Sequence, residues 1–324
     1  MMTDEELSNF RAMVRGMPVE NDREKLLEAQ LQKLVENVAD IRNGRGSRKR
    51  SLFVIGKSSS GKSFALEKLF SQIPEMQPFV NEHGQLVRPL LSIEAEEGGI
   101  PQLCNRVCRA LGLPERDKMT PDFAWTLIKA MLREHGVIYL HIDEAQDLLK
   151  HKTTYALSQM QVKLKSLIQT SEWPLHAIFS GVDELALLLA TVDDQLGNRA
   201  YKRRFDDLVL PDDLPVIKSI LETVAVENCK LKLDRKLLTD EFLGRLWVAG
   251  NRGAFGKIIE TVQEACFLAV KNEHAKLEID HFEYEYERHS GCLEKDNVFT
   301  APKWSDIVPQ RALADLNSTR KKKA

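Results

Sequence analysis

The stretch that decides the fold reads Gly56-Lys57-Ser58-Ser59-Ser60-Gly61-Lys62-Ser63. It matches the phosphate-loop pattern G-x-x-x-x-G-K-[ST] at every fixed position. The apolar run 52–55 before it is typical of a buried strand, and residues 64–70 after it are typical of a helix. A glycine-rich loop between a strand and a helix directs backbone N–H groups and the helix dipole at an anion. The eight residues therefore predict a nucleotide-binding cradle, with Lys62 on the β/γ-phosphates and Ser63 on Mg²⁺.

A second motif follows the strand-like run 137–142, which ends in Asp143 and Glu144. Carboxylates at the carboxyl end of a buried parallel strand lie beside the phosphate loop in such folds. We expect Asp143 to hold Mg²⁺, directly or through water, and Glu144 to polarise the attacking water. The alternative is that both acids simply begin the next helix, where they suit its dipole. Paired with the phosphate loop, they favour ATP hydrolysis over a small-molecule kinase reaction.

Length and composition set broad limits. The 324 residues can hold one large or two medium domains, and a hydrophobic content of 43% is ordinary for a globular protein. No apolar run approaches the roughly 18 residues of a membrane span. The acidic start, residues 1–6, lacks the apolar core of a signal peptide, so the sequence predicts a cytoplasmic protein with no membrane partner. Five cysteines, without zinc-site spacing, are expected to be core thiols: Cys104, Cys108, Cys229, Cys266 and Cys292.

Charge is uneven along the chain although the formal net charge is only −2. Basic side chains gather in three clusters that can contact phosphate backbones or can be solvated linkers. The clusters are Arg42, Arg45, Arg48, Lys49 and Arg50; then Arg199, Lys202, Arg203 and Arg204; and finally residues 320–323.

The order of predicted elements indicates an α/β core followed by a helical lid. Residues 1–50 are expected to form an N-terminal segment, irregular to residue 22, with an amphipathic helix at 23–42 and a flexible basic linker. Alternating strands and helices over 51–211 predict a parallel sheet. Four helices over 212–290 predict a small lid domain, and 291–324 predict a tail with a docking segment at 304–308. The expected strands are 52–55, 86–93, 137–142, 175–180 and 205–210; the core helices are 64–70, 100–111, 122–134, 158–169 and a segment ending at 189; the lid helices are 212–228, 236–249, 254–271 and 280–289.

This succession of phosphate loop, Asp-Glu strand, sensor strand, arginine cluster and lid is that of the AAA+ ATPases. Ser180 ends the expected fourth strand, where a polar sensor usually contacts the γ-phosphate or the attacking water. The alternative is that Ser180 caps the next helix.

The arginine cluster suggests a group that acts on a neighbouring subunit. In AAA+ rings an arginine near this point reaches the γ-phosphate of the next chain, where charge develops in the transition state. Arg204 is our first candidate, with Arg203 and Arg199 as alternatives, and a purely surface role is the competing interpretation. In the lid, Arg252 lies one residue before the usual second-sensor position, which is occupied by Gly253.

Four stretches together resemble the TniB/TnsC-type ATPases of bacterial transposons over residues 23–290. The most general are the phosphate loop and Ile142-Asp143-Glu144-Ala145-Gln146. More characteristic are Phe179-Ser180-Gly181-Val182-Asp183-Glu184-Leu185 and Arg203-Arg204-Phe205 before Leu210-Pro211.

The resemblance implies an ATP- and Mg²⁺-dependent regulator of transposition. Such proteins assemble on double-stranded DNA as rings or helical filaments, mark a target site and recruit a transposase. The transposase can stimulate disassembly through ATP hydrolysis, and some members partner with a targeting module. DNA-contacting loops are expected at 94–99 and 113–120, because such loops can line a central pore in this fold.

Two other functions compete with this interpretation. A replication initiator or helicase loader would share the fold but would typically add a separate DNA-binding module, for which residues 291–324 are too few. A signalling or defence NTPase acting as a protein-interaction switch would usually carry long repeat or effector domains, and the sequence shows no pattern for them.

Overall fold

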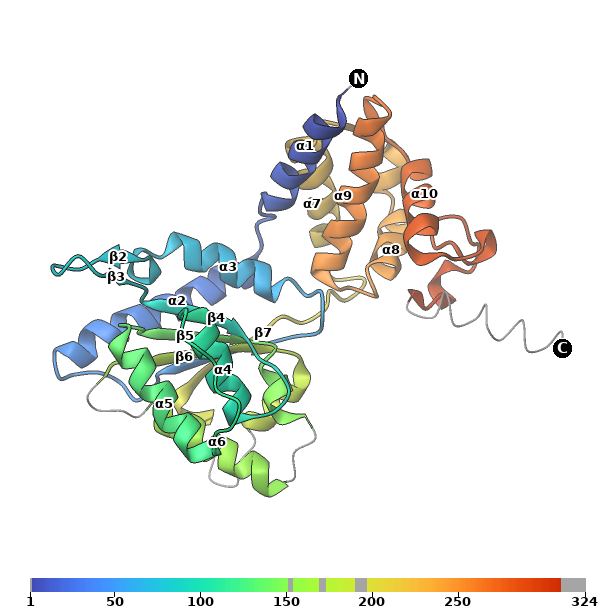
Figure 1. Cartoon of the computed structure of the whole chain (residues 1–324). Helices are drawn as coiled ribbons and strands as arrows, with labels where there is room; N and C mark the ends of the chain where they lie inside the picture. The colour runs from blue at the N-terminus through green and yellow to red at the C-terminus, as the bar shows by residue number, and fades with distance from the viewer. Residues whose placement is uncertain (1, 151–153, 169–172, 190–196, 310–324) are drawn as a thin grey trace. The chain divides into compact units, whose positions relative to one another are not determined.

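The computed structural model describes residues 2–150, 154–168, 173–189 and 197–309 (Figure 1). Contacts divide the chain into a core unit, residues 21–205, and a lid unit, which joins residues 1–20 to residues 206–324. No helix within the described ranges is both long and apolar enough to cross a bilayer.

The core unit is built on a five-stranded parallel sheet of order β4-β5-β6-β1-β7. This sheet places the strand of the phosphate loop between the strand that carries Ser180 and the edge strand that carries the arginines. The predicted α/β parallel-sheet fold is therefore confirmed. The strands are β1 (Ser51–Ile55), β4 (Leu90–Glu94), β5 (Tyr139–Asp143), β6 (His176–Gly181) and β7 (Ala200–Arg204).

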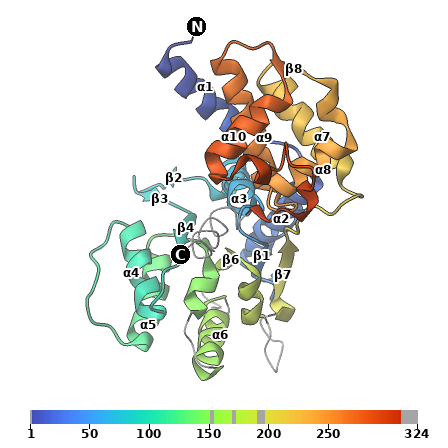
Figure 2. The same ribbon diagram turned by 90° about the vertical axis from the view of Figure 1, so that its right-hand side faces the viewer.

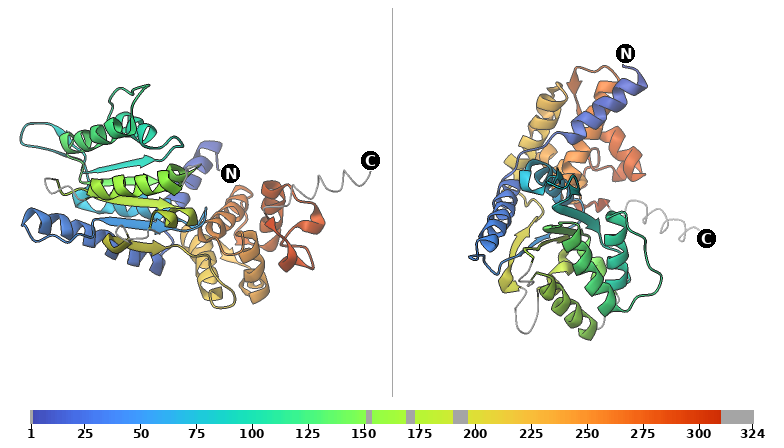
Figure 3. Two further views of the ribbon diagram at one scale, coloured as in Figure 1. Left: turned by 90° about the horizontal axis from the view of Figure 1, so that it is seen from below. Right: turned by 60° about the vertical axis from the view of Figure 1, so that its left-hand side comes forward.

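Helices cover both faces of this sheet, as the left-hand view of Figure 3 shows. Alternation along β1 separates the two layers, because successive side chains of a strand point to opposite faces. Leu52 and Val54 pack with α2 and α3, whereas Phe53 and Ile55 pack with α4, α5 and α6. The helices are α2 (Asp22–Arg42), α3 (Lys62–Gln72), α4 (Ile100–Ala110), α5 (Pro121–Glu134) and α6 (Thr154–Ile168).

The lid unit is a bundle of helices around its own apolar core, grouped together in Figure 2. Its helices are α1 (Asp4–Gly16), α7 (Leu214–Glu222), α8 (Asp240–Ala249), α9 (Phe255–Lys271) and α10 (Ile279–Ser290), and a π-helical turn, Thr223–Asn228, extends α7. A two-stranded pair joins β8 (Lys232–Leu233) to β9 (Lys276–Leu277).

The N-terminal segment differs from the prediction. Residues 4–16, expected to be irregular, form α1, which begins with a capping box between Thr3 and Glu6. Helix α1 packs on α9 through Phe10 and Phe267, whose ring centroids are 6.1 Å apart. Residues 1–50 are thus shared between the two units, because α1 buries its apolar face in the lid and α2 buries its own against the sheet.

The fifth strand was predicted at the wrong place. Residues 205–210 form no strand; the edge strand is Ala200–Arg204, whose register with β1 runs from Ala200 opposite Ser51 to Arg204 opposite Ile55. Pairing with β1 selects this polar stretch, and the apolar Leu208 packs instead in the lid core.

Smaller differences have local causes. Pro89 divides the expected strand 86–93, so that β3 (Leu86–Val87) pairs with β2 (Phe79–Val80) in a hairpin and only β4 joins the main sheet. The segment after β6 is a 3₁₀ helix, Asp183–Leu188. Part of the expected tail is packed, since Val298 and Phe299 are buried in the lid core. The basic end at 320–323 and residue 169 lie outside the described residues.

Candidate nucleotide site

The phosphate loop connects β1 to α3, as predicted. Gly61 has a φ of 90° and Ser59 a φ of 62°, so the chain passes twice through the left-handed region before α3 begins at Lys62. At Gly56 a Cβ would lie 2.5 Å from the carbonyl oxygen of Phe205. Only glycine allows this close approach of β1 to the end of β7, so Gly56 is required by packing as well as by the motif.

Lys62 is held inside the curl of the loop. Its side chain is buried, and Nζ donates to the carbonyl oxygens of Gly56 at 2.7 Å and Lys57 at 2.9 Å, and to Ser60 Oγ at 3.3 Å. Burial lowers the pKa of Lys62, and the nearby negative charges of Glu144, Asp143 and Asp183 oppose that shift. The ammonium group is therefore preorganised in the cradle, where phosphate oxygens would be alternative acceptors for it.

Asp143 receives three hydrogen bonds. Ser63 Oγ donates to Oδ2 at 2.9 Å, Ser180 Oγ donates to Oδ1 at 2.5 Å, and the backbone N–H of Glu144 donates to Oδ1 at 2.9 Å. Burial disfavours the charged form, but the bonds from Ser180 and Ser63 and the neighbouring His141 leave the pKa of Asp143 lowered. Asp143 is thus an ionised carboxylate next to the Ser63 hydroxyl, a pair of oxygen donors that suits Mg²⁺.

His141 is a member of this network that the sequence analysis missed. It is buried on β5, with Nε2 2.7 Å from Ser180 Oγ and Nδ1 2.8 Å from Ser92 Oγ. Burial lowers the pKa of His141 to about 4, so the ring is neutral near pH 7. Since the Ser180 hydroxyl gives its proton to Asp143, it accepts from Nε2–H, and Nδ1 accepts from Ser92. The sequence did contain one signal for His141. It is two residues before Asp143 on the expected strand, so both side chains lie on the same face of the sheet.

Glu144 is held in an unusual conformation. Its φ of 48° and ψ of 37° lie in the left-handed region, which is costly for a residue with a Cβ. Gln146 Nε2 donates to Glu144 Oε2 at 2.5 Å, and Gln146 Oε1 accepts from the backbone N–H of Val182 at 3.1 Å. A Cβ at Gly181 would lie 2.1 Å from Gln146 Oε1, so the glycine makes room for this bridge. Gln146 therefore ties the carboxylate to the end of β6.

We expect Gln146→Ala to lower kcat for ATP hydrolysis by about 10- to 100-fold while changing nucleotide affinity by less than about threefold, because it removes the positioning of Glu144 and leaves the cradle intact. Steady-state kinetics and nucleotide titration of the same preparation measure the two effects. Gln77→Ala is a matched control, since Gln77 is likewise a glutamine whose amide is hydrogen-bonded, in its case to the carbonyl oxygens of Phe70 and Ile73, away from the site. Unchanged kcat in Gln146→Ala would show that Gln146 does not position Glu144.

The structure separates the candidate arginines. Arg203 and Arg204 are successive residues of β7 and point to opposite faces, while Arg199 ends the short 3₁₀ helix Gly197–Arg199. Arg204 Nη2 lies 3.2 Å from Asp183 Oδ1, and both side chains are more than half exposed, at 58% and 53%. Such an exposed pair is weak and can exchange partners. Arg204 is thus the arginine linked, through Asp183, to the charges around Lys62.

Arg252 makes its contacts within the lid unit. Nη2 donates to the carbonyl oxygens of Ser305 at 2.6 Å and Ile307 at 3.2 Å, and the guanidinium lies 5.8 Å from the ring centroid of Trp247. These contacts give Arg252 a role in holding the C-terminal segment, and its use as a second sensor stays a prediction.

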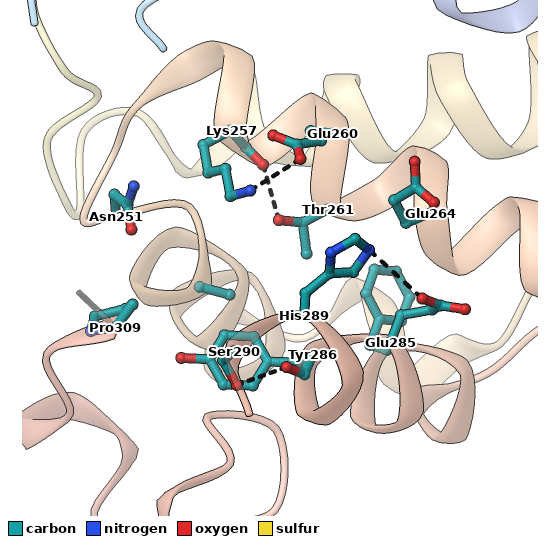
Figure 4. Close-up of a pocket in the computed structure, with 12 residues that line it drawn as sticks. Asn251, Lys257, Glu260, Thr261, Glu264, Glu285, Tyr286, His289, Ser290 and Pro309 are labelled. Carbon is teal, nitrogen blue, oxygen red and sulfur yellow. Dashed lines mark hydrogen bonds and ion pairs between the residues drawn. The ribbon is translucent and has the colours of Figure 1, made fainter. Parts of the chain in front are cut away.

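A pocket of about 270 Å³ lies between α9 and α10 of the lid unit (Figure 4). Ligand atoms of Glu264, Glu285 and His289 lie within 4.8 Å of one another at its edge. Arg15 pairs with Glu264 at 2.7 Å, and His289 lies 3.6 Å from Glu285, which Arg288 also contacts at 3.3 Å. These ion pairs account for the charged groups, so the cluster is explained by side chains that connect α1 with α9 and pair with one another along α10.

The fold and the site together define a class. The parallel sheet with strand order β4-β5-β6-β1-β7, the phosphate loop after β1 and the acids after β5 form an AAA+ P-loop fold with the residues of a nucleoside triphosphatase. Residues 42–189 match a family model described as an AAA domain.

Solved structures agree on the fold. The chain is similar to Cdc6p from Pyrobaculum aerophilum, with a TM-score of 0.53 and 14% identity over 81% of this chain and 66% of that one. It is also similar to the ORC2 protein of Aeropyrum pernix in its ADPNP–ADP complexes, with a TM-score of 0.52 and 14% identity over 84% of this chain and 68% of that one. The search among curated proteins found no match.

Proposed function

We propose that this protein is an ATP-hydrolysing AAA+ switch that acts on double-stranded DNA. The observation that carries the proposal is the convergence of Lys62, Ser63, Asp143, Glu144 and Ser180 at the carboxyl ends of three adjacent strands. The backbone N–H of Gly56 donates to the carbonyl oxygen of Gly181 at 3.1 Å, which joins the phosphate loop to the sensor strand.

Each side chain has a role that its contacts support. Lys62 and the loop N–H groups would hold the β/γ-phosphates, with Gly56, Gly61 and the residues between them forming the cradle. Ser63 and Asp143 would hold Mg²⁺, which supplies electrostatic stabilisation of phosphate charge. Glu144 would orient a water and take its proton, and Ser180 would contact the γ-phosphate or that water.

The setting that we favour is regulation of transposition. The resemblance of residues 142–146, 179–185 and 203–211 to TniB/TnsC-type ATPases supports it. The protein would then assemble on DNA as a ring or helical filament in its ATP state, mark a target and recruit a transposase, with a targeting protein as a further partner. An interface arginine, Arg204 or an alternative, would make assembly depend on nucleotide.

The similarity to Cdc6p and ORC2 favours a second candidate function, that of a replication initiator or helicase loader. Both functions need ATP and DNA, but they differ in how DNA is chosen. A transposition regulator should bind duplexes of many sequences, whereas an initiator should prefer a defined origin sequence.

We expect duplex DNA binding to require ATP or a non-hydrolysable analogue, to be largely independent of sequence and to weaken steeply with salt. The salt effect follows from counterion release, with a log–log slope of about −0.9 per phosphate contact. Electrophoretic shifts of several unrelated duplexes across a salt series, with and without nucleotide, would measure this. Lys62→Ala is the control, since it should bind no duplex with either nucleotide. Nucleotide-independent binding to one defined sequence would favour the initiator instead.

A further inference from the structure

Cations from separate segments converge on one aromatic ring of the core unit. Tyr201 lies on the edge strand β7; Lys33 Nζ of α2 lies 5.7 Å from its ring centroid, and Lys49 Nζ, just before β1, lies 5.4 Å from it. Arg48 is the exposed neighbour of Lys49 in the chain. Lys202 follows Tyr201 on β7, so its side chain points to the other face of the sheet. We name the surface formed by Lys33, Arg48, Lys49 and Tyr201 the Tyr201 face.

The basic segment before β1 is fixed to α2, although the sequence suggests a flexible linker. The buried Asn37 accepts from the backbone N–H of Ser47 at 2.6 Å and donates to the carbonyl oxygens of Ser47 at 3.2 Å and Lys49 at 3.3 Å. On the other side, Gln30 Nε2 donates to the carbonyl oxygen of Lys202 at 3.2 Å. The cations are therefore presented at defined positions, which lowers the entropy lost when a ligand binds them.

The positive charge of this surface is not neutralised. None of Lys33, Arg48 and Lys49 forms an ion pair with a residue in the described part of the chain, although the acids Glu36 and Asp40 lie on the same helix as Lys33. In other parts of the core unit, exposed acids form ion pairs with cations; Asp122, for example, pairs with Lys163 at 2.5 Å. Clustered, unneutralised cations create a field that attracts a polyanion.

The loop 94–99, one of the two loops expected to contact DNA, is poorly suited to it. Residues 94–99 carry three acids, and Arg106 is engaged with two of them, lying 2.9 Å from Glu96 and 3.8 Å from Glu94. Lys150 pairs with the third, Glu97, at 3.0 Å. The loop 113–120 is balanced in charge, with Glu115 and Asp117 beside Arg116 and Lys118, and Glu115 pairs with Arg109 at 2.8 Å. The acidic loop 94–99, whose nearby cations are already paired, therefore repels a phosphate backbone.

We propose that the Tyr201 face binds the phosphate backbone of duplex DNA. The inference rests on the proposed function, which it deepens by naming the contact surface. Two ammonium groups already lie over the tyrosine ring, so the ring positions cations and is not free to stack on bases. Recognition would therefore be of backbone charge, which matches sequence-independent binding to a duplex.

The test compares two double variants on one fluorescent random-sequence duplex. Lys33→Ala/Lys49→Ala should reduce the magnitude of the salt slope by about 2 and weaken binding roughly tenfold or more near 0.1 M salt, because two phosphate contacts are lost. Arg88→Ala/Lys230→Ala removes the same charge from exposed positions elsewhere: Arg88 lies just before β4, at the opposite edge of the sheet, and Lys230 lies in the lid unit. This control should bind DNA like the parent. Both variants should hydrolyse ATP at the parent rate without DNA, which shows that they are folded.

Each outcome decides a different claim. If the parent binds DNA and both double variants lose affinity equally, the effect is one of net charge, and the proposal that the Tyr201 face binds DNA is wrong. The proposal is also wrong if Lys33→Ala/Lys49→Ala keeps the salt slope of the parent, or if polyglutamate of matched charge competes with the labelled duplex as well as unlabelled DNA does. If the parent shows no ATP-dependent DNA binding at all, the proposed DNA function itself fails.

Discussion

Glu144→Gln should bind ATP like the parent protein and hydrolyse it about 10²- to 10⁴-fold more slowly, the range expected when a general base is removed. The substitution preserves shape, and its amide oxygen can still accept the hydrogen bond that Gln146 donates to Glu144. It removes only the capacity to take a proton from water. Nucleotide titration and single-turnover phosphate release measure binding and chemistry separately.

Lys62→Ala provides the contrast, because it removes the group that pairs with phosphate. Nucleotide binding itself should be lost, and hydrolysis with it. The buried Nζ also bonds to the carbonyl oxygens of Gly56 and Lys57, so thermal unfolding should be compared with the parent before the result is interpreted. If Glu144→Gln turns over at the parent rate while Lys62→Ala is inactive, the cradle is correct and another group activates the water.

The nucleotide cradle could be predicted from the sequence because its signal is contiguous. Eight neighbouring residues specify the loop, and the flanking apolar run and helix-forming segment specify its context. The core thiols were also predictable, since small apolar residues are usually buried, and all five cysteines are.

The edge strand was not predictable for a physical reason. Ala200–Arg204 has few apolar side chains, and its strand conformation comes from backbone pairing with β1, which is a tertiary interaction. The segment 205–210, with four apolar residues in six, looked more like a strand, but Leu208 contributes to the lid core. Local pattern was overridden by long-range pairing, as happens often with strands.

Positioning residues were missed for a different reason. His141 lies within an apolar run, and Gln146 lies just after the acids, so neither stands out by type or spacing. Their roles depend on contacts with Ser180 and with the backbone of Val182, which are close only once β5 and β6 pair. Distant residues that meet through sheet formation carry little signal in a single sequence.

Arg204→Ala should lose ATP hydrolysis and ATP-dependent assembly on DNA while keeping nucleotide binding and monomer stability. The pair with Asp183 is exposed, so its loss should cost no more than about 1 kcal/mol of unfolding free energy. In an assembly the guanidinium would leave Asp183 for the γ-phosphate of the adjacent chain, where it would stabilise developing charge. Light scattering and phosphate release measure assembly and turnover.

Mixing variants decides whether this arginine acts in trans. Arg204→Ala protein keeps the cradle and Lys62→Ala protein keeps the arginine, so an equal mixture should regain hydrolysis, up to roughly a quarter of the parent activity, which is the share of complete sites if the two chains alternate at random in the assembly. Lys62→Ala mixed with Glu144→Gln is the control and should regain nothing, because both changes fall in the same half-site. Activity that stays lost in the first mixture would mean that Arg204 acts within its own chain, as its contact with Asp183 allows. Normal turnover by the Arg204→Ala protein alone would exclude a role for Arg204 in hydrolysis. Arg203, and then Arg199, would be the next candidate.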